Sequence, residues 1–421
     1  MQSSTKPGDP LPGLTPGQLA FFKASKDEFS APESVEEGLG PRMNLDSCLG
    51  CHAQPAAGGS SPATNPQIAF AIKMANRVPS FISANGPVRE ARFKTNPDGS
   101  PDGGVHSLFT IAGSMRTCNL QQPDFDSAVS SNNVIFRIPT PVFGAGLIEQ
   151  IPDSVLLANQ AADAGTKQAL GIRGRPNIVL AGSTISGQPN HNGNDGTAAR
   201  FGWKAQNKSL LLFAGEAYNV EMGITNELFQ TERDETPGCL SGSTPNDVGN
   251  PDGTSMATAA SGIEKFAAFM RFLAPPAPSP TLPGGAISIL KGRGLFMSTG
   301  CAQCHTPTLH TENSTVAALS NKPVNLFSDL LIHDMGAGLA DGISQGQAGP
   351  SEFRTAPLWG LGQRIYFLHD GRTSNLLDAI QQHFSFGTPS QAPSEANAVI
   401  ANYNRLSEQD KQHLLNFLRS L

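Results

Sequence analysis

The sequence predicts a mainly α-helical protein with two unequal halves, and three observations support this fold class. The chain has 421 residues, enough for two domains. A short motif, Cys-x-x-Cys-His, occurs twice, and each copy is followed further along the chain by an amphipathic segment that begins with a helix-capping residue. A proline-rich segment separates the halves. We therefore expect an internal duplication.

The proline-rich segment at 274–285 is the expected boundary between the domains. Proline fixes φ and lacks an N–H group, so this segment is excluded from helix interiors and central strands. We expect one domain at 1–273 and another at 286–421, with 274–285 as the linker. Much of the first domain is rich in Gly, Pro, Asn and Asp, which predicts a long, loop-rich insertion.

Each half is expected to close with a capped helix. Ser261 and Glu264 have the spacing of a capping box, and apolar residues follow at helical spacing. Near the C-terminus, Ser407 and Asp410 predict the start of a similar helix.

Charge and hydropathy exclude two classes of partner. The net charge is −6 and there is no long run of Lys or Arg, so we expect no nucleic-acid binding. No stretch reaches the roughly 18 consecutive apolar residues that would indicate a membrane span. We therefore expect no membrane-spanning segment.

The repeated motif is the strongest chemical signal in the sequence. The copies are Cys48, Cys51 and His52, and Cys301, Cys304 and His305. Two thiols about one helical turn apart can both bond to one edge of a porphyrin, while the adjacent imidazole binds the iron. Zinc sites use similar residues, but their Cys pairs lie closer together and need no His after both. We predict two covalent c-type haems in two cytochrome c-like domains.

Covalent haem attachment has a consequence for location, because it normally takes place after export. We therefore expect a periplasmic or secreted protein. Residues 1–7 lack the basic and apolar regions of a signal peptide, so we expect the export signal to have been removed from this chain.

His383 is the best-placed candidate for a sixth iron ligand. Thr373 or Ser374 is the predicted cap of a helix on which Leu376, Ala379, Ile380 and His383 share one face. This pattern places His383 on the buried stripe, where it fits either an iron ligand or an ordinary core histidine.

Several segments carry a resemblance to known enzymes. Residues 353–361, 367–372 and 376–380 resemble the C-terminal haem domain of bacterial dihaem cytochrome c peroxidases, whose superfamily includes the enzyme that matures methylamine dehydrogenase. More closely, the chain resembles the di-haem oxidoreductase family, once labelled thiol oxidoreductase. That resemblance rests on residues 38–44, 137–144, 202–204 and 330–336.

The resemblance implies roles for particular residues. It places His383 where the peroxidases have the Met, or the maturase the Tyr, that ligates the C-terminal haem; Met335 is the competing ligand. Trp203 matches the Trp between the haems, and Glu221 matches the Glu above the N-terminal iron. The resemblance to the peroxidases also implies a calcium ion between the haems, held largely by backbone oxygens.

The chain departs from the peroxidase pattern near the N-terminal haem. Leu211 stands where the peroxidases carry a Gln, with Glu216 as the nearest polar substitute, and Lys204 replaces an Asp. No sixth ligand for this haem is assigned. His106 and His191 lie in polar loops that could reach it.

These observations predict a peroxidase-type oxidoreductase. A carboxylate such as Glu221 could take a proton from peroxide and return it to the departing oxygen. Hydrogen peroxide or another small oxidant would react at the N-terminal haem, and electrons would come from a small cytochrome c or cupredoxin through the C-terminal haem. The alternatives are a pure electron-transfer cytochrome and an oxidase or oxygenase acting on an organic or thiol substrate.

The two cysteines outside the motifs give the first testable prediction. Cys118 and Cys239 are expected to form a disulfide, because leftover thiols in an oxidising compartment usually pair. Mass spectrometry of the unreduced, alkylated protein should find both residues unmodified by the alkylating reagent. Two alkylated thiols would show that this pairing is wrong.

Overall fold

The computed structural model describes residues 5–111, 120–180, 184–185, 188–189, 195–231, 239 and 244–421. Within these ranges helices occupy more of the chain than strands, in agreement with the predicted mainly α class. The helices of residues 1–273 are α1 (Pro16–Ser30), α2 (Cys48–Cys51), α3 (Pro66–Lys73), α4 (Phe125–Ser130), α5 (Ala145–Glu149), α6 (Asp153–Ala161), α7 (Ala164–Leu170), α8 (Leu210–Met222), α9 (Met256–Ala259) and α10 (Gly262–Phe272). Those that follow are α11 (Ala286–Thr299), α12 (Gly336–Leu339), α13 (Leu376–Gln381), α14 (Asn397–Asn404) and α15 (Glu408–Ser420).

The strands are short and form small antiparallel sheets. A three-stranded sheet has the order β3 (Val105–His106), β2 (Glu90–Phe93), β5 (Val134–Arg137). The two-stranded pairs are β1 (Arg42–Met43) with β4 (Phe109–Thr110), β6 (Asn177–Leu180) with β9 (Asp195–Ala199), β7 (Thr184–Ile185) with β8 (Gln188–Pro189), β10 (Leu309–His310) with β11 (Pro323–Val324), and β12 (Ile332–Asp334) with β13 (Glu352–Arg354). Single 3₁₀ turns occur at Val35–Glu37, Cys301–Gln303 and Leu361–Gln363.

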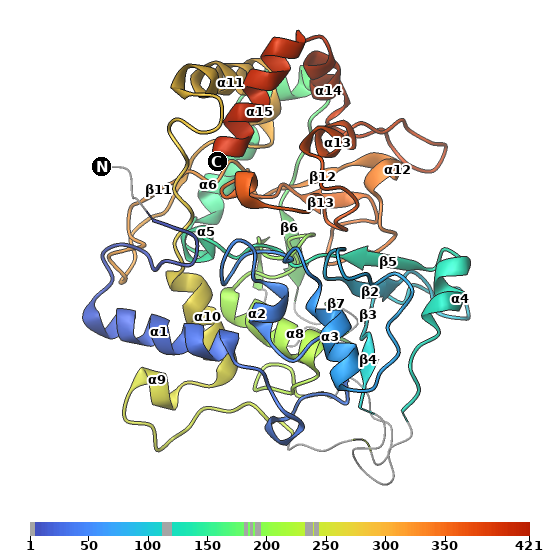
Figure 1. Ribbon diagram of the computed structural model, residues 1–421. Coiled ribbons are helices and arrows are strands. Elements are labelled where there is room, and N and C mark those ends of the chain that lie inside the picture. Colours follow the sequence, from blue (N-terminus) through green and yellow to red (C-terminus); the bar gives the residue numbers. More distant parts are fainter. Residues whose placement is uncertain are drawn as a thin grey trace.

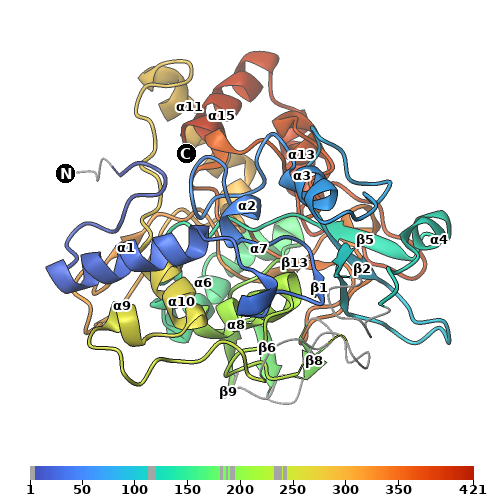
Figure 2. The same ribbon diagram turned by 60° about the horizontal axis from the view of Figure 1, so that its bottom comes forward.

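The same helix pairing occurs once in each half. In the N-terminal half α1 lies against α10, and the first Cys-x-x-Cys-His copy follows in α2; Figure 2 shows these three helices together. In the C-terminal half α11 lies against α15, and the second copy begins directly after α11 (Figure 1). Each half therefore contains two packed helices and one copy of the motif.

The predicted starts of both closing helices are confirmed. α10 begins after Ser261, which forms a capping box with Glu264. α15 begins after Ser407, whose hydroxyl accepts a hydrogen bond from the Asp410 N–H at 3.2 Å. These contacts satisfy backbone N–H groups that the first turn of a helix leaves without intrahelical partners.

The helix before His383 differs from the prediction at both ends. Its cap is Asn375, whose Oδ1 accepts from Leu377 N at 2.9 Å. Thr373, one of the predicted caps, instead accepts a hydrogen bond from Asn375 N and so shapes the preceding turn. The helix α13 ends at Gln381, so His383 lies in the turn after it rather than on its buried stripe.

The hydrophobic core does not follow the predicted domain boundary. Its larger cluster joins residues 11–274 with Leu309, Leu326, Leu330 and Trp359, whereas a smaller cluster is confined to residues 296–421. Arg175 also pairs with Ile332 through two backbone hydrogen bonds, at 3.1 and 2.9 Å. The long insertion therefore packs against both halves.

The proline-rich segment contains neither helix nor strand, as expected. It is nevertheless attached at several points, because Ala277 N donates to Thr5 O and Ser279 N donates to Ser420 O. None of the helices in the described part of the chain is long and apolar enough to cross a membrane.

The close contact between α11 and α15 gives a prediction for stability. Gly292 lies where a Cβ atom would come within 2.0 Å of the His413 carbonyl oxygen, whereas nothing lies within 4 Å of a Cβ at Gly294 on the same helix. Gly292→Ala should lower the free energy of unfolding by about 1–3 kcal/mol, because the helices must separate.

The matched control is Gly294→Ala, which should raise the free energy of unfolding by about 0.5–1 kcal/mol through helix propensity. Denaturant unfolding of both variants provides the comparison. Equal effects of the two substitutions would show that the helix contact is not close.

Candidate functional site

The first Cys-x-x-Cys-His copy lies at a cavity in the N-terminal half. Cys48 and Cys51 lie in α2, which begins after Ser47, the acceptor of a hydrogen bond from Gly50 N. Cys48, Cys51 and His52 all line the cavity. Burial raises the pKa of Cys48 to about 12 and that of Cys51 well above its usual value, so both side chains are neutral thiols.

The His52 ring is oriented by the turn that follows the motif. Its Nδ1 lies 3.0 Å from the Gly59 carbonyl oxygen. A side chain at Gly59 would meet the Gln54 carbonyl oxygen at 1.9 Å, so this tight turn requires glycine. Burial lowers the pKa of His52 to about 4, which leaves a neutral imidazole. An imidazole whose Nδ1 is held by a carbonyl presents Nε2 to a metal.

The second copy repeats this arrangement in the C-terminal half. Cys301, Cys304 and His305 line a second cavity, and His305 Nδ1 lies 3.0 Å from the Phe327 carbonyl oxygen. Burial and the nearby His383 lower the pKa of His305 to about 4. Both motif histidines are therefore neutral and fixed through the same ring nitrogen.

His383 lies on the same cavity as His305. Its Nδ1 is 2.8 Å from the Ala379 carbonyl oxygen, one turn earlier in α13, and burial lowers its pKa. Four histidines line this cavity, His305, His333, His369 and His383. Of these, His305 and His383 are neutral imidazoles whose Nδ1 is held by a backbone carbonyl. Met335, the alternative ligand, lines this cavity too.

Two arginines on the second cavity could not be recognised as site residues from the sequence. Arg354 is buried and Arg364 half-buried, and within the described residues their hydrogen bonds go only to backbone carbonyls. Burial lowers both pKa values to about 10, so both remain charged at neutral pH. A haem brings two propionates, which could neutralise such charges. Together with two thiols and two imidazoles, these groups fit a haem.

Glu221 lines the first cavity, at the end of α8, as part of a polar network. Asn44 donates to its Oε2 at 2.6 Å, and its carboxyl is hydrogen-bonded to Glu90, which in turn pairs with Arg92 at 2.7 Å. Burial, followed by the neighbouring Glu90 charge, raises the pKa of Glu221 well above its usual value. Despite burial, Arg92 lowers the pKa of Glu90. The pair therefore holds one proton, on Glu221.

The partners of Glu221 could not be recognised in the sequence. Asn44, Glu90 and Arg92 come from the β1 region and from β2, far along the chain from α8, and no motif spacing connects them. Glu216, the predicted polar substitute, also lines this cavity and accepts a hydrogen bond from Asn207. Leu211 is not among the lining residues.

Trp203 lines both cavities. Its indole Nε1 donates to the Ile138 carbonyl oxygen at 2.9 Å, and its ring meets His369 edge-on with centroids 6.4 Å apart. The preceding Gly202 has φ +86°, and a side chain there would collide with Gln206. The chain therefore presents this indole between the two motif sites.

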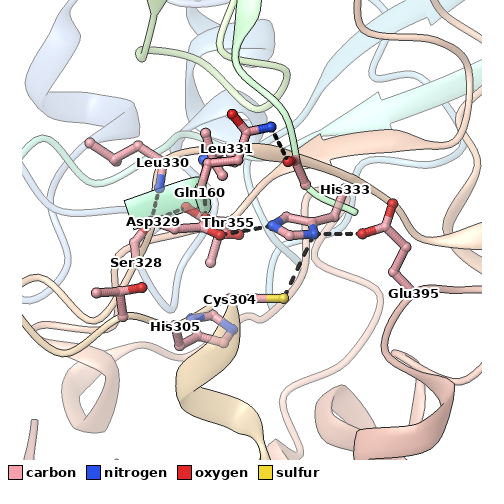
Figure 3. A network of polar contacts seen from close by, with 12 residues as sticks. Gln160, Cys304, His305, Ser328, Asp329, Leu330, Leu331, His333, Thr355 and Glu395 are labelled. Carbon is pink, nitrogen blue, oxygen red and sulfur yellow. Dashed lines mark hydrogen bonds and ion pairs between the residues drawn. The ribbon is translucent and has the colours of Figure 1, made fainter. Parts of the chain in front are cut away.

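A buried histidine adjoins the second motif, as Figure 3 shows. His333 contacts Asp329 at 2.9 Å, Glu395 at 2.8 Å and the Cys304 sulfur at 3.7 Å. Burial alone would lower its pKa, but Cys304 and Asp329 raise it well above the usual value. Cys304, Asp329 and His333 are close enough to share a metal ion, within 4.8 Å of one another. Because Cys304 belongs to the second motif, we assign the group to the surroundings of that motif.

The structure does not bring every candidate to a cavity. His106 Nε2 lies 3.1 Å from Asp102, its ring stacks on Phe93, and it is not a lining residue of the first cavity. His191 and Cys118 lie outside the described residues. Cys239 is 3% exposed, and its pairing with Cys118 stays a prediction.

Comparison with known proteins assigns the chain to a family. Residues 95–421 match the family described as "Di-haem oxidoreductase, putative peroxidase", and the chain belongs to this family. It is therefore an oxidoreductase of a class that carries two haems. No curated protein matches the chain.

Three solved structures illustrate more distant likeness. A hydrazine synthase from Kuenenia stuttgartiensis is 16% identical, with a TM-score of 0.26, 50% of this chain covered and 60% of that chain. A MauG-like protein associated with microbial copper homeostasis is 18% identical, with a TM-score of 0.31; the match covers 67% of this chain and 89% of that chain. The diheme peroxidase BthA from Burkholderia thailandensis is 16% identical, with a TM-score of 0.31; the match covers 53% of this chain and 66% of that chain. The assignment rests on the family match alone.

Proposed function

We propose that the protein is an exported di-haem peroxidase that reduces hydrogen peroxide with electrons from a small redox protein. Both haems would be bonded covalently, one to Cys48 and Cys51 and the other to Cys301 and Cys304. The support is that each pair of thiols shares a cavity with a neutral histidine whose Nδ1 lies at hydrogen-bond distance from a backbone carbonyl. This attachment is also the reason for proposing a periplasmic or secreted location.

The two cavities differ in what faces the motif histidine. The C-terminal cavity contains His383, which we propose would bind the iron of the C-terminal haem together with His305. The N-terminal cavity has no second histidine among its described lining residues, and its methionines, Met222 and Met270, belong to the hydrophobic core. We therefore propose the C-terminal haem as the electron store and the N-terminal haem as the reactive centre.

The observation that carries the proposal is the carboxyl pair on the N-terminal cavity. Reduction of hydrogen peroxide to two waters consumes two electrons and two protons, and one oxygen must lose a proton while the other gains one. Glu221 holds a proton, and Glu90 is an ionised acceptor stabilised by Arg92. The pair can therefore give and take a proton at the same site.

The rest of the site controls access and orientation. Bound haem supplies the redox-active iron, and the chain supplies the surroundings of the peroxide. Asn44 holds the Glu221 carboxyl in place with a 2.6 Å hydrogen bond. Trp203 lies between the cavities and is the group best placed to couple them. The electron donor would be a small cytochrome c or a cupredoxin.

The role of His383 can be tested by substitution. His383→Ala should leave the protein loaded with haem but convert the C-terminal centre from low spin to high spin, because one strong-field ligand is lost. Electron paramagnetic resonance and optical spectra provide the measurement. Met335→Leu is the matched variant and should leave the spin state unchanged; the opposite pattern would transfer the ligand role to Met335.

The role of Glu221 separates an enzyme from an electron relay. Glu221→Gln keeps the size and the hydrogen bond from Asn44 but removes proton transfer, so oxidation of the reduced protein by peroxide should slow by roughly 10²–10⁴-fold. Stopped-flow spectroscopy at constant haem content provides the rate.

The control for this experiment is Glu33→Gln. Glu33 is also a partly buried carboxyl with a raised pKa, about 7 because of burial, but it accepts a hydrogen bond from Tyr218 and does not line the cavity. Its substitution should leave the peroxide rate nearly unchanged. Equal rates for wild type and Glu221→Gln would contradict the peroxidase proposal.

A further inference from the structure

Lys204 is completely buried next to Trp203, the residue that lines both cavities, and we call this interior region the seam. It follows Trp203 in the chain and has an exposed fraction of 0%. Its Nζ donates to the carbonyl oxygens of Gly349 and Glu352, at 2.8 and 2.9 Å, and lies 3.1 Å from Asp341 Oδ1. Three oxygens thus surround one ammonium group.

An aromatic ring completes the surroundings of the ammonium group, and we call these three oxygens and the Phe353 ring the cage. Nζ lies 4.1 Å from the centroid of the Phe353 ring, a distance typical of a cation–π contact. Two carbonyls, one carboxylate and one aromatic face are all groups that attract a cation. The cage therefore has the chemistry of a cation site, and the cation that occupies it is the ammonium group of Lys204.

A metal ion cannot share this cage with Lys204. Calcium binds oxygen at about 2.3–2.6 Å. Nζ already lies 2.8–3.1 Å from the three oxygens and occupies the space between them. The calcium ion implied by the peroxidase resemblance therefore does not fit here, where Lys204 replaces the Asp of those enzymes.

The charges around the cage are already balanced by the chain. Asp341 forms an ion pair with Lys204 through Oδ1 and a second ion pair, at 2.5 Å, with the Arg137 guanidinium through Oδ2. Glu352 is paired with Arg175 through its carboxylate. Burial lowers the pKa of Lys204 to about 8, against the opposing effect of Asp341, so the ammonium remains protonated at pH 7.

The cage also holds the backbone of Trp203. The Trp203 carbonyl oxygen accepts a hydrogen bond from Arg354 N at 2.9 Å, and Arg354 is the last residue of β13. Glu352 and Phe353, in the same strand, contact the Lys204 ammonium. The strand β13 is therefore bonded both to the backbone of Trp203 and to the side chain of the residue after it.

We propose that the ammonium of Lys204 is the resident cation of the seam, where it positions β13 and Trp203, and that the protein needs no calcium ion there. Lys204 is a positioning residue in this account. The inference goes beyond the proposed peroxidase function and holds for any reaction at the two cavities.

The first test uses the wild-type holoprotein at pH 7. Isothermal titration with calcium chloride should detect no binding, and treatment with a chelator should leave the unfolding midpoint unchanged. Calcium binding that raises the midpoint, with a loss on chelation, would overturn the proposal. This measurement requires no variant to fold and does not depend on peroxidase activity.

The second test empties the cage. Lys204→Ala should lower the unfolding midpoint by at least about 5 °C, since it leaves Asp341 and two carbonyls without the buried cation. Methylammonium or calcium should restore part of this shift, because either cation can enter the vacated space. Lys204→Met fills that space without charge and should show no recovery.

The matched control is Lys291→Met, on the exposed surface of α11, which should change neither the midpoint nor its response to cations. A midpoint for Lys204→Ala equal to that of wild type would contradict the proposal. A lowered midpoint that does not respond to either cation would also contradict it, because it would indicate a packing role instead of a cation role.

Discussion

The hydrogen bond between Nδ1 of each motif histidine and a backbone carbonyl is the constraint on which the rest of the site depends. It fixes the direction of the His52 and His305 rings, and burial keeps both rings neutral. A neutral, oriented imidazole can bind a metal through its other nitrogen without first losing a proton. The paired helices of each half then position the thiols beside these rings.

The two motifs share one local geometry, but different residues line the cavity at each of them. At the second cavity another anchored neutral imidazole, His383, faces the motif, and Arg354 and Arg364 supply positive charge. At the first cavity a carboxyl pair shares one proton. Two equivalent attachment motifs can thus perform different tasks, because the residues facing them come from unrelated parts of the chain.

The sequence predicted the features that depend on local patterns. The two motifs, the caps Ser261 and Ser407 and the absence of regular structure at 274–285 all follow from short-range chemistry. Neither boundary of α13 was predicted. At its start Asn375 and Thr373 are both suitable caps, and at its end the turn that contains His383 has no strong signal in the sequence.

Long-range contacts account for what the sequence could not reveal. The insertion packs against both halves, so the hydrophobic core crosses the expected boundary. Glu90 lies in β2 of the three-stranded sheet and is hydrogen-bonded to Glu221, which is distant in the sequence. Lys204 and Asp341 are also far apart in the sequence and come together only when the chain folds. The buried environment of Lys204 reverses the usual expectation that a lysine lies at the surface.

The most direct test of the account is an electron paramagnetic resonance spectrum of the fully oxidised holoprotein. We expect one low-spin centre, from His305 and His383, and one high-spin centre, from the haem that His52 would hold near Glu221. Two low-spin centres would contradict it, because the N-terminal iron would then have no position at which peroxide could react.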